Sequence, residues 1–145
     1  LHRTANDILS DSATDTAGTS WYFPNCARVP GGSFWIVAGR ATCTEDSIAL
    51  QPRVTFFRLH PTASERDDNA PLNIVEADRQ NYIGEIDFIA FKDPGVPSVT
   101  YNDDIRKKIT CAPMETGVYA IVTTLVAEAN ETAGMNLRFE FEIER

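Results

Sequence analysis

The stretch MNLRFEFEIER, residues 135–145, decides the fold class. Its apolar side chains fall on every second position, and these are Leu137, Phe139, Phe141 and Ile143. The positions between them are polar and comprise Asn136, Arg138, Glu140, Glu142 and Glu144. Because successive side chains of a β-strand point to opposite faces, this alternation predicts a strand with one face in a core and the other in solvent.

Residues upstream of this strand have the same β-rich composition. VYAIVTTLVAE (118–128) is largely apolar or threonine on both parities, which is typical of a strand covered on both faces in the middle of a sheet. SWYFPNCARV (20–29) and SFWIVAGRATC (33–43) are rich in aromatic and β-branched residues and flank the breaker Pro30-Gly31-Gly32. They predict two more strands.

The middle of the chain adds further strands and one ambiguous segment. RVTFFRLHP (53–61) and NYIGEIDFIAF (81–91) predict strands, and Gly84 predicts a bulge within the second. NIVEADRQ (73–80) fits either a short strand or a helical turn. With about seven to nine strands and no clear helical periodicity, the chain predicts an all-β fold, an antiparallel β-sandwich that is jelly-roll-like.

The first 20 residues, LHRTANDILSDSATDTAGTS, differ from the rest of the chain. They are polar apart from a few residues such as Ile8 and Leu9, and alone they would not bury enough surface to offset their ordering entropy. We therefore expect an extended N-terminal arm (1–20) in front of a single sandwich domain (21–145). Packing along its own domain, pairing with a neighbouring subunit or crystal contacts would order such an arm. We favour pairing with a neighbour, with Ile8, Leu9, Trp21 and Tyr22 as its anchors.

Charge and hydropathy exclude some classes of partner. The formal net charge is -8 and the isoelectric point about 4.7, and the longest basic run is Arg106-Lys107-Lys108. Phosphate binding needs a coherent basic face, so no nucleic acid is expected. No apolar run reaches the roughly 18 residues of a membrane-spanning helix. The chain begins at Leu1 without a basic-then-apolar leader, which favours a mature secreted or cell-surface product.

Three cysteines, Cys26, Cys43 and Cys111, lie far apart and form no CxxC pair. Zinc ligation through sulfur is therefore not expected. In an oxidising compartment we expect one disulfide and one free thiol, with Cys111 bridged to either of the other two. The alternative is three buried thiols that act as small hydrophobic side chains.

The chain offers little for catalysis. Its two histidines, His2 and His60, lie outside any nucleophile, zinc-protease or phosphate-loop motif. The row Glu140, Glu142 and Glu144 has strand spacing, where mutual repulsion favours solvated carboxylates over an acid/base pair. We therefore expect no enzymatic activity, and a small hydrolase with two carboxylates stays open as a third alternative.

Two acidic loop clusters are candidate calcium sites. Calcium takes six to eight oxygen ligands, and loops at the ends of a sandwich supply them well. The candidate ligands are Asp67, Asp68, Asp103 and Asp104. The alternative is that both clusters are solvated turns, because Asp and Asn suit turn backbone angles. Calcium is the one cofactor the sequence suggests.

Aromatic residues near these loops suggest a sugar site. Tyr101 and Asn102, beside the second acidic cluster, are the candidate ligand-binding residues. One glycosylation sequon occurs at Asn130-Glu131-Thr132.

ITCAPMETGVYAIVTT (109–124), followed by AGMNLRFEFEIE (133–144), resembles the closing pattern of bacterial pre-peptidase C-terminal domains. The matching residues are Ala112, Pro113, Gly117, Tyr119, Ile121 and Val122. The resemblance implies a secreted, non-catalytic β-sandwich of a kind that accompanies hydrolases and in some members binds calcium or polymeric substrates. RVTFFRLHP departs from the family's middle strands, so the resemblance covers only the C-terminal third.

Together these observations favour a non-catalytic extracellular structural subunit, of the kind found in filaments or surface layers. Its N-terminal arm would pair with a neighbouring subunit, which implies a homo-oligomer or polymer. The alternative is an extracellular carbohydrate- or polymer-binding module that uses the loops around Asp67, Asp103 and Tyr101, with a glycan partner and a calcium requirement.

Overall fold

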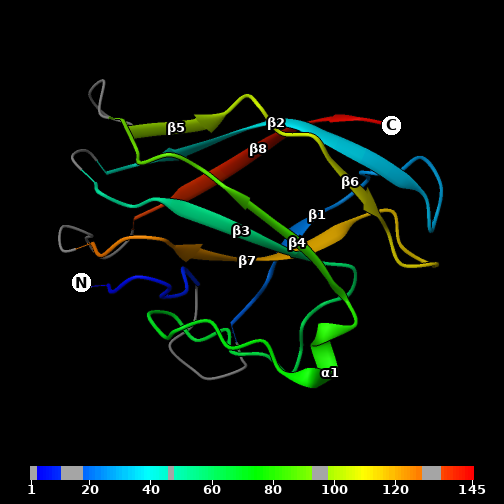
Figure 1. Ribbon diagram of the computed structural model, residues 1–145, viewed down its shortest axis with the longest axis horizontal. Coiled ribbons are helices and arrows are strands. Elements are labelled where there is room, and N and C mark those ends of the chain that lie inside the picture. Colours follow the sequence, from blue (N-terminus) through cyan, green and yellow to red (C-terminus); the bar gives the residue numbers. More distant parts are fainter. Residues whose placement is uncertain (1–2, 11–17, 46–47, 93–97, 129–134) are drawn as a thin grey trace.

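Figure 1 shows the computed structural model, in which two antiparallel sheets of four strands stack face to face. It describes residues 3–10, 18–45, 48–92, 98–128 and 135–145. The strands are β1 (Trp21–Phe23), β2 (Ser33–Cys43), β3 (Pro52–Phe57), β4 (Tyr82–Asp87), β5 (Ser98–Asn102), β6 (Lys107–Thr110), β7 (Val118–Thr124) and β8 (Leu137–Glu144). The predicted all-β sandwich is confirmed. The ambiguous segment forms the one-turn helix α1 (Glu76–Arg79). Within the described residues, no helix is long and apolar enough to cross a bilayer.

The first sheet has the strand order β1-β7-β3-β4. Its central strands β3 and β7 are buried on both faces, as the sequence predicted for residues 118–124. One face packs against the second sheet. The other face is covered by the N-terminal segment and the 58–81 stretch with α1 (Figure 1), where Ile8, Phe57 and Ile121 form a separate apolar cluster.

The second sheet is built around β2, the longest strand. β8 pairs along one edge of β2, while β5 and β6 share the other edge in tandem. The register of β8 on β2 shifts between Ile36 and Ala38, so Val37 forms a bulge. Opposite this bulge the chain between β5 and β6 leaves the sheet, and the Ile105 N–H donates to the Val37 carbonyl at 3.2 Å.

Aromatic rings fill the space between the two sheets. Phe141 of β8 has its ring centroid 5.7 Å from that of Phe56 and 6.0 Å from that of Phe88. It lies over Gly39 of β2, where an added Cβ would be 2.9 Å from the Phe141 ring. A side chain at position 39 would therefore push β8 away from β2, and only glycine permits this close approach.

Residues 3–10 of the expected arm pack on the body of the sandwich. Ile8 and Leu9 are 1% and 4% exposed, and both lie in the domain's own apolar clusters. The Leu9 N–H donates to the Val122 carbonyl at 2.9 Å, so this segment extends the edge of β7 that β1 also occupies. The buried Arg3 guanidinium donates to the Ile8 carbonyl at 2.7 Å and pairs with Asp68 at 3.0 Å. Residues 3–10 thus belong to the sandwich, and the boundary at residue 20 does not hold for them.

Truncation of Leu9 tests this assignment. Because Leu9 is fully packed, Leu9→Ala should lower the free energy of unfolding by about 2–5 kcal/mol. Urea denaturation measures the loss. The control is Val29→Ala, at a side chain 60% exposed, which should change stability by less than about 0.5 kcal/mol. Equal, negligible losses for both variants would show that residues 3–10 do not pack as described.

The expected disulfide is also wrong. Cys26, Cys43 and Cys111 are all free and buried, and each belongs to the main apolar core. The Cys26 thiol donates to the Phe23 carbonyl at 3.3 Å. Burial raises the pKa of Cys26 to about 11 and also raises the pKa of Cys111. The three thiols therefore act as small core side chains, the alternative that the sequence left open.

Thiol titration checks this state. Since only the thiolate reacts, the native protein at pH 8 should react with Ellman's reagent far more slowly than a free thiol. In guanidinium without reductant all three cysteines should react, because none is bridged. Release of a single equivalent from the denatured protein would instead reveal a disulfide.

Candidate functional site

One side of the sandwich stays open between the edge strands β1 and β8, and we call this side the seam. Trp21 and Phe139 meet across it edge to face, with ring centroids 5.1 Å apart, and Phe23 meets Phe141 at 5.3 Å. Side chains alone make these contacts, since no backbone pairing joins β1 to β8 in the described chain.

The opposite side of the sandwich is bridged by hydrogen bonds along β5. There the chain that follows β4 runs beside β5, and Lys92 and Val99 exchange two backbone hydrogen bonds of 2.7 and 2.9 Å. The Thr100 hydroxyl donates to the Ile89 carbonyl at 2.6 Å, and the Asn102 amide donates to the Asp87 carbonyl at 2.9 Å. Beyond Asn102 a polar hollow of about 410 Å³ lies between β4 and the start of β6. The seam, where an unpaired strand edge lies beside apolar side chains, is the better candidate for an interaction site.

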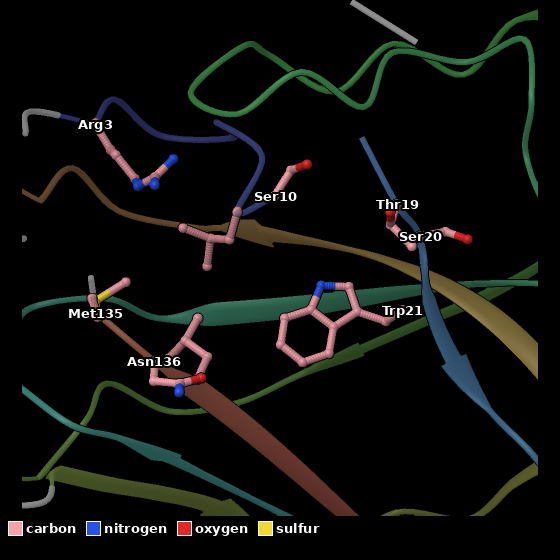
Figure 2. A pocket seen from close by; sticks show the side chains of 9 residues that line it. Arg3, Ser10, Thr19, Ser20, Trp21, Met135 and Asn136 are labelled. Carbon is pink, nitrogen blue, oxygen red and sulfur yellow. The ribbon is translucent and has the colours of Figure 1, made fainter. Parts of the chain in front are cut away.

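The larger of two hollows in the seam lies at the start of β8 and has a volume of about 380 Å³. Figure 2 shows the Trp21 ring extending across it toward Met135 and Asn136. Its lining residues are Arg3, Leu9, Ser10, Thr19, Ser20, Trp21, Met135, Asn136 and Leu137. A flat indole beside an amide and hydroxyl groups can receive either an apolar side chain or a sugar ring.

The second hollow, of about 270 Å³, lies at the other end of β8. It is lined by Phe23, Phe141 and Ile143 at the seam and reaches the core residues Phe34 and Phe56. Most of its lining side chains are apolar, although Asn25 and Arg145 also line it, so a hydrophobic side chain with a polar end fits it best.

The backbone of β8 is unpaired along the seam. The Thr44 N–H donates to the Asn136 carbonyl at 3.1 Å, so the backbone groups of even-numbered residues face β2. Those of Leu137, Phe139 and Phe141 therefore face away from it. In the described parts of the chain β8 pairs with β2 alone, which leaves a row of donors and acceptors beside half-buried apolar side chains.

The solvent face of β8 is acidic. Glu140 is held in ion pairs with Arg40 and Arg138. Glu142 and Glu144 are exposed, and neither forms an ion pair with any residue the structure describes. The end of β8 nearest its C-terminus thus carries two carboxylates without an ion pair among the described residues, next to the smaller hollow that Arg145 also lines.

The four predicted arm anchors separate in the structure. Trp21 and Leu9 line the larger hollow, whereas Ile8 lies in the cluster on the outer face of the first sheet. Tyr22 points outward and stacks on Tyr119, with ring centroids 4.7 Å apart. Only Trp21 combines a seam position with a partly exposed side chain.

The four predicted calcium ligands do not form a cluster. Asp68 accepts hydrogen bonds from Arg3 at 3.0 Å and from the Ser10 N–H at 2.8 Å, so its charge is already compensated. Asp103 and Asp104 are exposed in the β5–β6 connection. Among the described residues no three His, Cys, Asp or Glu side chains are placed to hold a metal ion. Calcium binding stays a prediction.

The predicted sugar-binding pair is engaged in local contacts. The Tyr101 hydroxyl accepts from Lys92 Nζ at 2.9 Å, and the same ammonium lies 5.0 Å from the ring centroid. Asn102 uses its amide to fix β5 to Asp87. The glycosylation candidate Asn130 lies outside the described residues.

A cluster of Ser20, His60 and Arg66 escaped the sequence analysis because its members are distant in the chain. Ser20 Oγ lies 2.6 Å from His60 Nδ1, and Arg66 Nη1 lies 3.2 Å from His60 Nε2. Arginine can only donate, so Nε2 must accept and Nδ1 carries the proton that it donates to Ser20. The serine is therefore not activated as a nucleophile. Burial, together with the Arg66 charge, lowers the pKa of His60.

Stability should fall on mild acidification because of this cluster. A histidine whose folded-state pKa is lowered stabilises the fold above its unfolded pKa of about 6.5, and that contribution is lost as pH falls through the folded value. Wild type should lose more stability between pH 7.5 and 5.5 than His60→Gln, which cannot gain this charge. Urea denaturation at both pH values measures the difference, and parallel losses in the two proteins would contradict it.

The chain matches no protein-family model, no curated protein and no solved structure. The resemblance to pre-peptidase C-terminal domains therefore stays a prediction, and the candidate function rests on the seam.

Proposed function

We propose that this chain is a non-catalytic structural subunit of an extracellular assembly, and that it joins the assembly by accepting an extended strand of a neighbour along β8. The open edge of β8 carries the proposal. This strand has eight residues, its outer edge is unpaired within the described chain, and two hollows flank its apolar face.

An extended strand satisfies both features of the seam at once. Its backbone would supply the hydrogen bonds that Leu137, Phe139 and Phe141 leave open toward solvent, which gives affinity. Its alternate side chains would enter the hollows and cover the half-buried face of β8, which gives specificity. A globular partner would meet the side chains but leave the backbone row unpaired.

The chain already uses strand addition within its own fold. Residues 6–9 complete the edge of β7 through backbone hydrogen bonds and two buried side chains, Ile8 and Leu9. The arm expected from the sequence to reach a neighbour thus acts within the domain in its described part. Of the described strands at sheet edges, β8 is the longest, which favours it as the edge that accepts a neighbour. Self-association of the chain stays a prediction.

For the alternative function, carbohydrate binding, the larger hollow is a better candidate site than the loops around Tyr101. Trp21 offers a flat ring next to the Asn136 amide, whereas Lys92 already contacts both the hydroxyl and the ring of Tyr101. Sugar rings stack on indole and bond to amide groups, so a glycan is the second candidate ligand for the seam. It would leave the smaller, apolar hollow unused.

Fusion of a strand to the chain tests the proposal. An eight-residue segment alternating valine and threonine is joined to Arg145 through a flexible glycine-serine linker, which gives millimolar effective concentration. It should pair antiparallel with β8, raise the melting temperature and slow amide exchange at Leu137, Phe139 and Phe141. The matched control replaces every threonine with proline, which cannot donate to a ladder.

Equal melting temperature and exchange in the two fusions would refute strand acceptance at β8. A glycan panel distinguishes the second candidate. In a Trp35→Phe background the fluorescence of Trp21 alone is followed, and saturable quenching by one glycan, without any effect of the valine-threonine strand, would favour the carbohydrate-binding function.

A further inference from the structure

The charge of β8 identifies the kind of strand that it accepts. We infer that the partner strand alternates apolar residues with lysine or arginine, and that its basic residues lie opposite Glu142 and Glu144. The inference rests on the proposed function, since it specifies the occupant of the same edge.

The cross-strand geometry carries the first step. Residues directly opposite each other in a sheet lie about 4.5–5.5 Å apart at Cβ and point to the same face. Every second side chain of an added strand would therefore stand beside Glu140, Glu142 or Glu144. Glu140 already has Arg40 and Arg138, so the two remaining carboxylates are the ones that a basic side chain would neutralise.

The positions of the two hollows set the spacing of the apolar residues in the partner strand. Leu137 lines the larger hollow and Ile143 the smaller one, and six residues of strand span about 20 Å. Between the hollows Trp21 and Phe139 are in contact and leave less room. The partner strand should thus carry large apolar residues four to six positions apart, with smaller ones between them.

A second copy of β8 meets these requirements less well than a basic strand. In an antiparallel pair centred on Glu140 this residue would face its own copy, and in a pair centred on Phe141 it would face Glu142 at two places. The strand has a single basic residue, Arg138, to set against its three glutamates. Like charges directly opposite each other destabilise a sheet, so a strand that carries only basic residues at these positions is the favoured occupant.

Three fusions that differ only in charge test the inference. Segments alternating valine with lysine, threonine or glutamate are joined to Arg145 through the same linker. The lysine segment should give the highest melting temperature and the glutamate segment the lowest, with about 3–6 °C between lysine and threonine. In 1 M salt the difference should shrink, because exposed charges are screened.

Reversal of charge on β8 is the matched control. In the double variant Glu142→Lys/Glu144→Lys the glutamate segment should become the most stabilising. The unfused double variant should melt close to wild type, because both side chains are solvent-exposed and unpaired. Sedimentation velocity of each fusion checks that it is monomeric, so that the strand acts within one chain.

The outcomes distinguish the basic character of the partner strand from strand acceptance at β8 itself. Equal stabilisation by all three segments would overturn the basic-strand inference and leave strand acceptance standing. No stabilisation by any segment would overturn both. A dimer of the unfused wild type with protected amides at Leu137, Phe139 and Phe141 would show that a second copy is the occupant and would also overturn the inference.

Discussion

The pairing of β8 along β2 is the constraint on which the rest of the structure depends. It places Phe139 and Phe141 between the sheets, where they meet rings from β1, β3 and the end of β4. The close contact requires Gly39 in β2, because a larger residue would collide with the Phe141 ring. The same pairing directs half of the β8 backbone away from the sheet and so creates the open seam.

The edge strands β5 and β8 differ in whether another segment of the chain covers their outer edge. At β5 the chain protects the edge by laying residues 88–92 against it with backbone and side-chain hydrogen bonds. At β8 the outer edge is unpaired within the described chain, and glutamates lie on the solvent face of the strand. Charge keeps an edge from pairing with like edges while leaving it accessible to an oppositely charged strand. The acidic residues of β8 thus influence which strands can pair with it.

Features set by local pattern could be predicted from the sequence. The alternation in residues 137–144 identified a strand with one face in the core, and the apolar character of both parities in residues 118–128 identified a central strand. Both predictions depend on period-two geometry alone. Gly84 was also predicted as a bulge, and it has a φ of +148° where the β3–β4 register shifts.

Features that depend on distant partners could not be predicted. Ile8 and Leu9 are buried by Phe57, Ile121 and Val122, and nothing in the first 20 residues encodes that contact. Bridged and free cysteines in apolar surroundings look alike in a sequence. The Trp21 hollow combines residues from both ends of the chain, so no spacing rule points to it.

The docking of residues 3–9 onto residues 122–128 has a consequence for the order of folding. These partners are separated by more than a hundred positions, so residues 3–9 cannot complete their pairing with β7 until residues 122–128 have been synthesised. Contacts of such long sequence separation slow folding, since the loop-closure entropy must be overcome before the contact contributes. Residues 3–9 should therefore reach their final position only after β7 has formed.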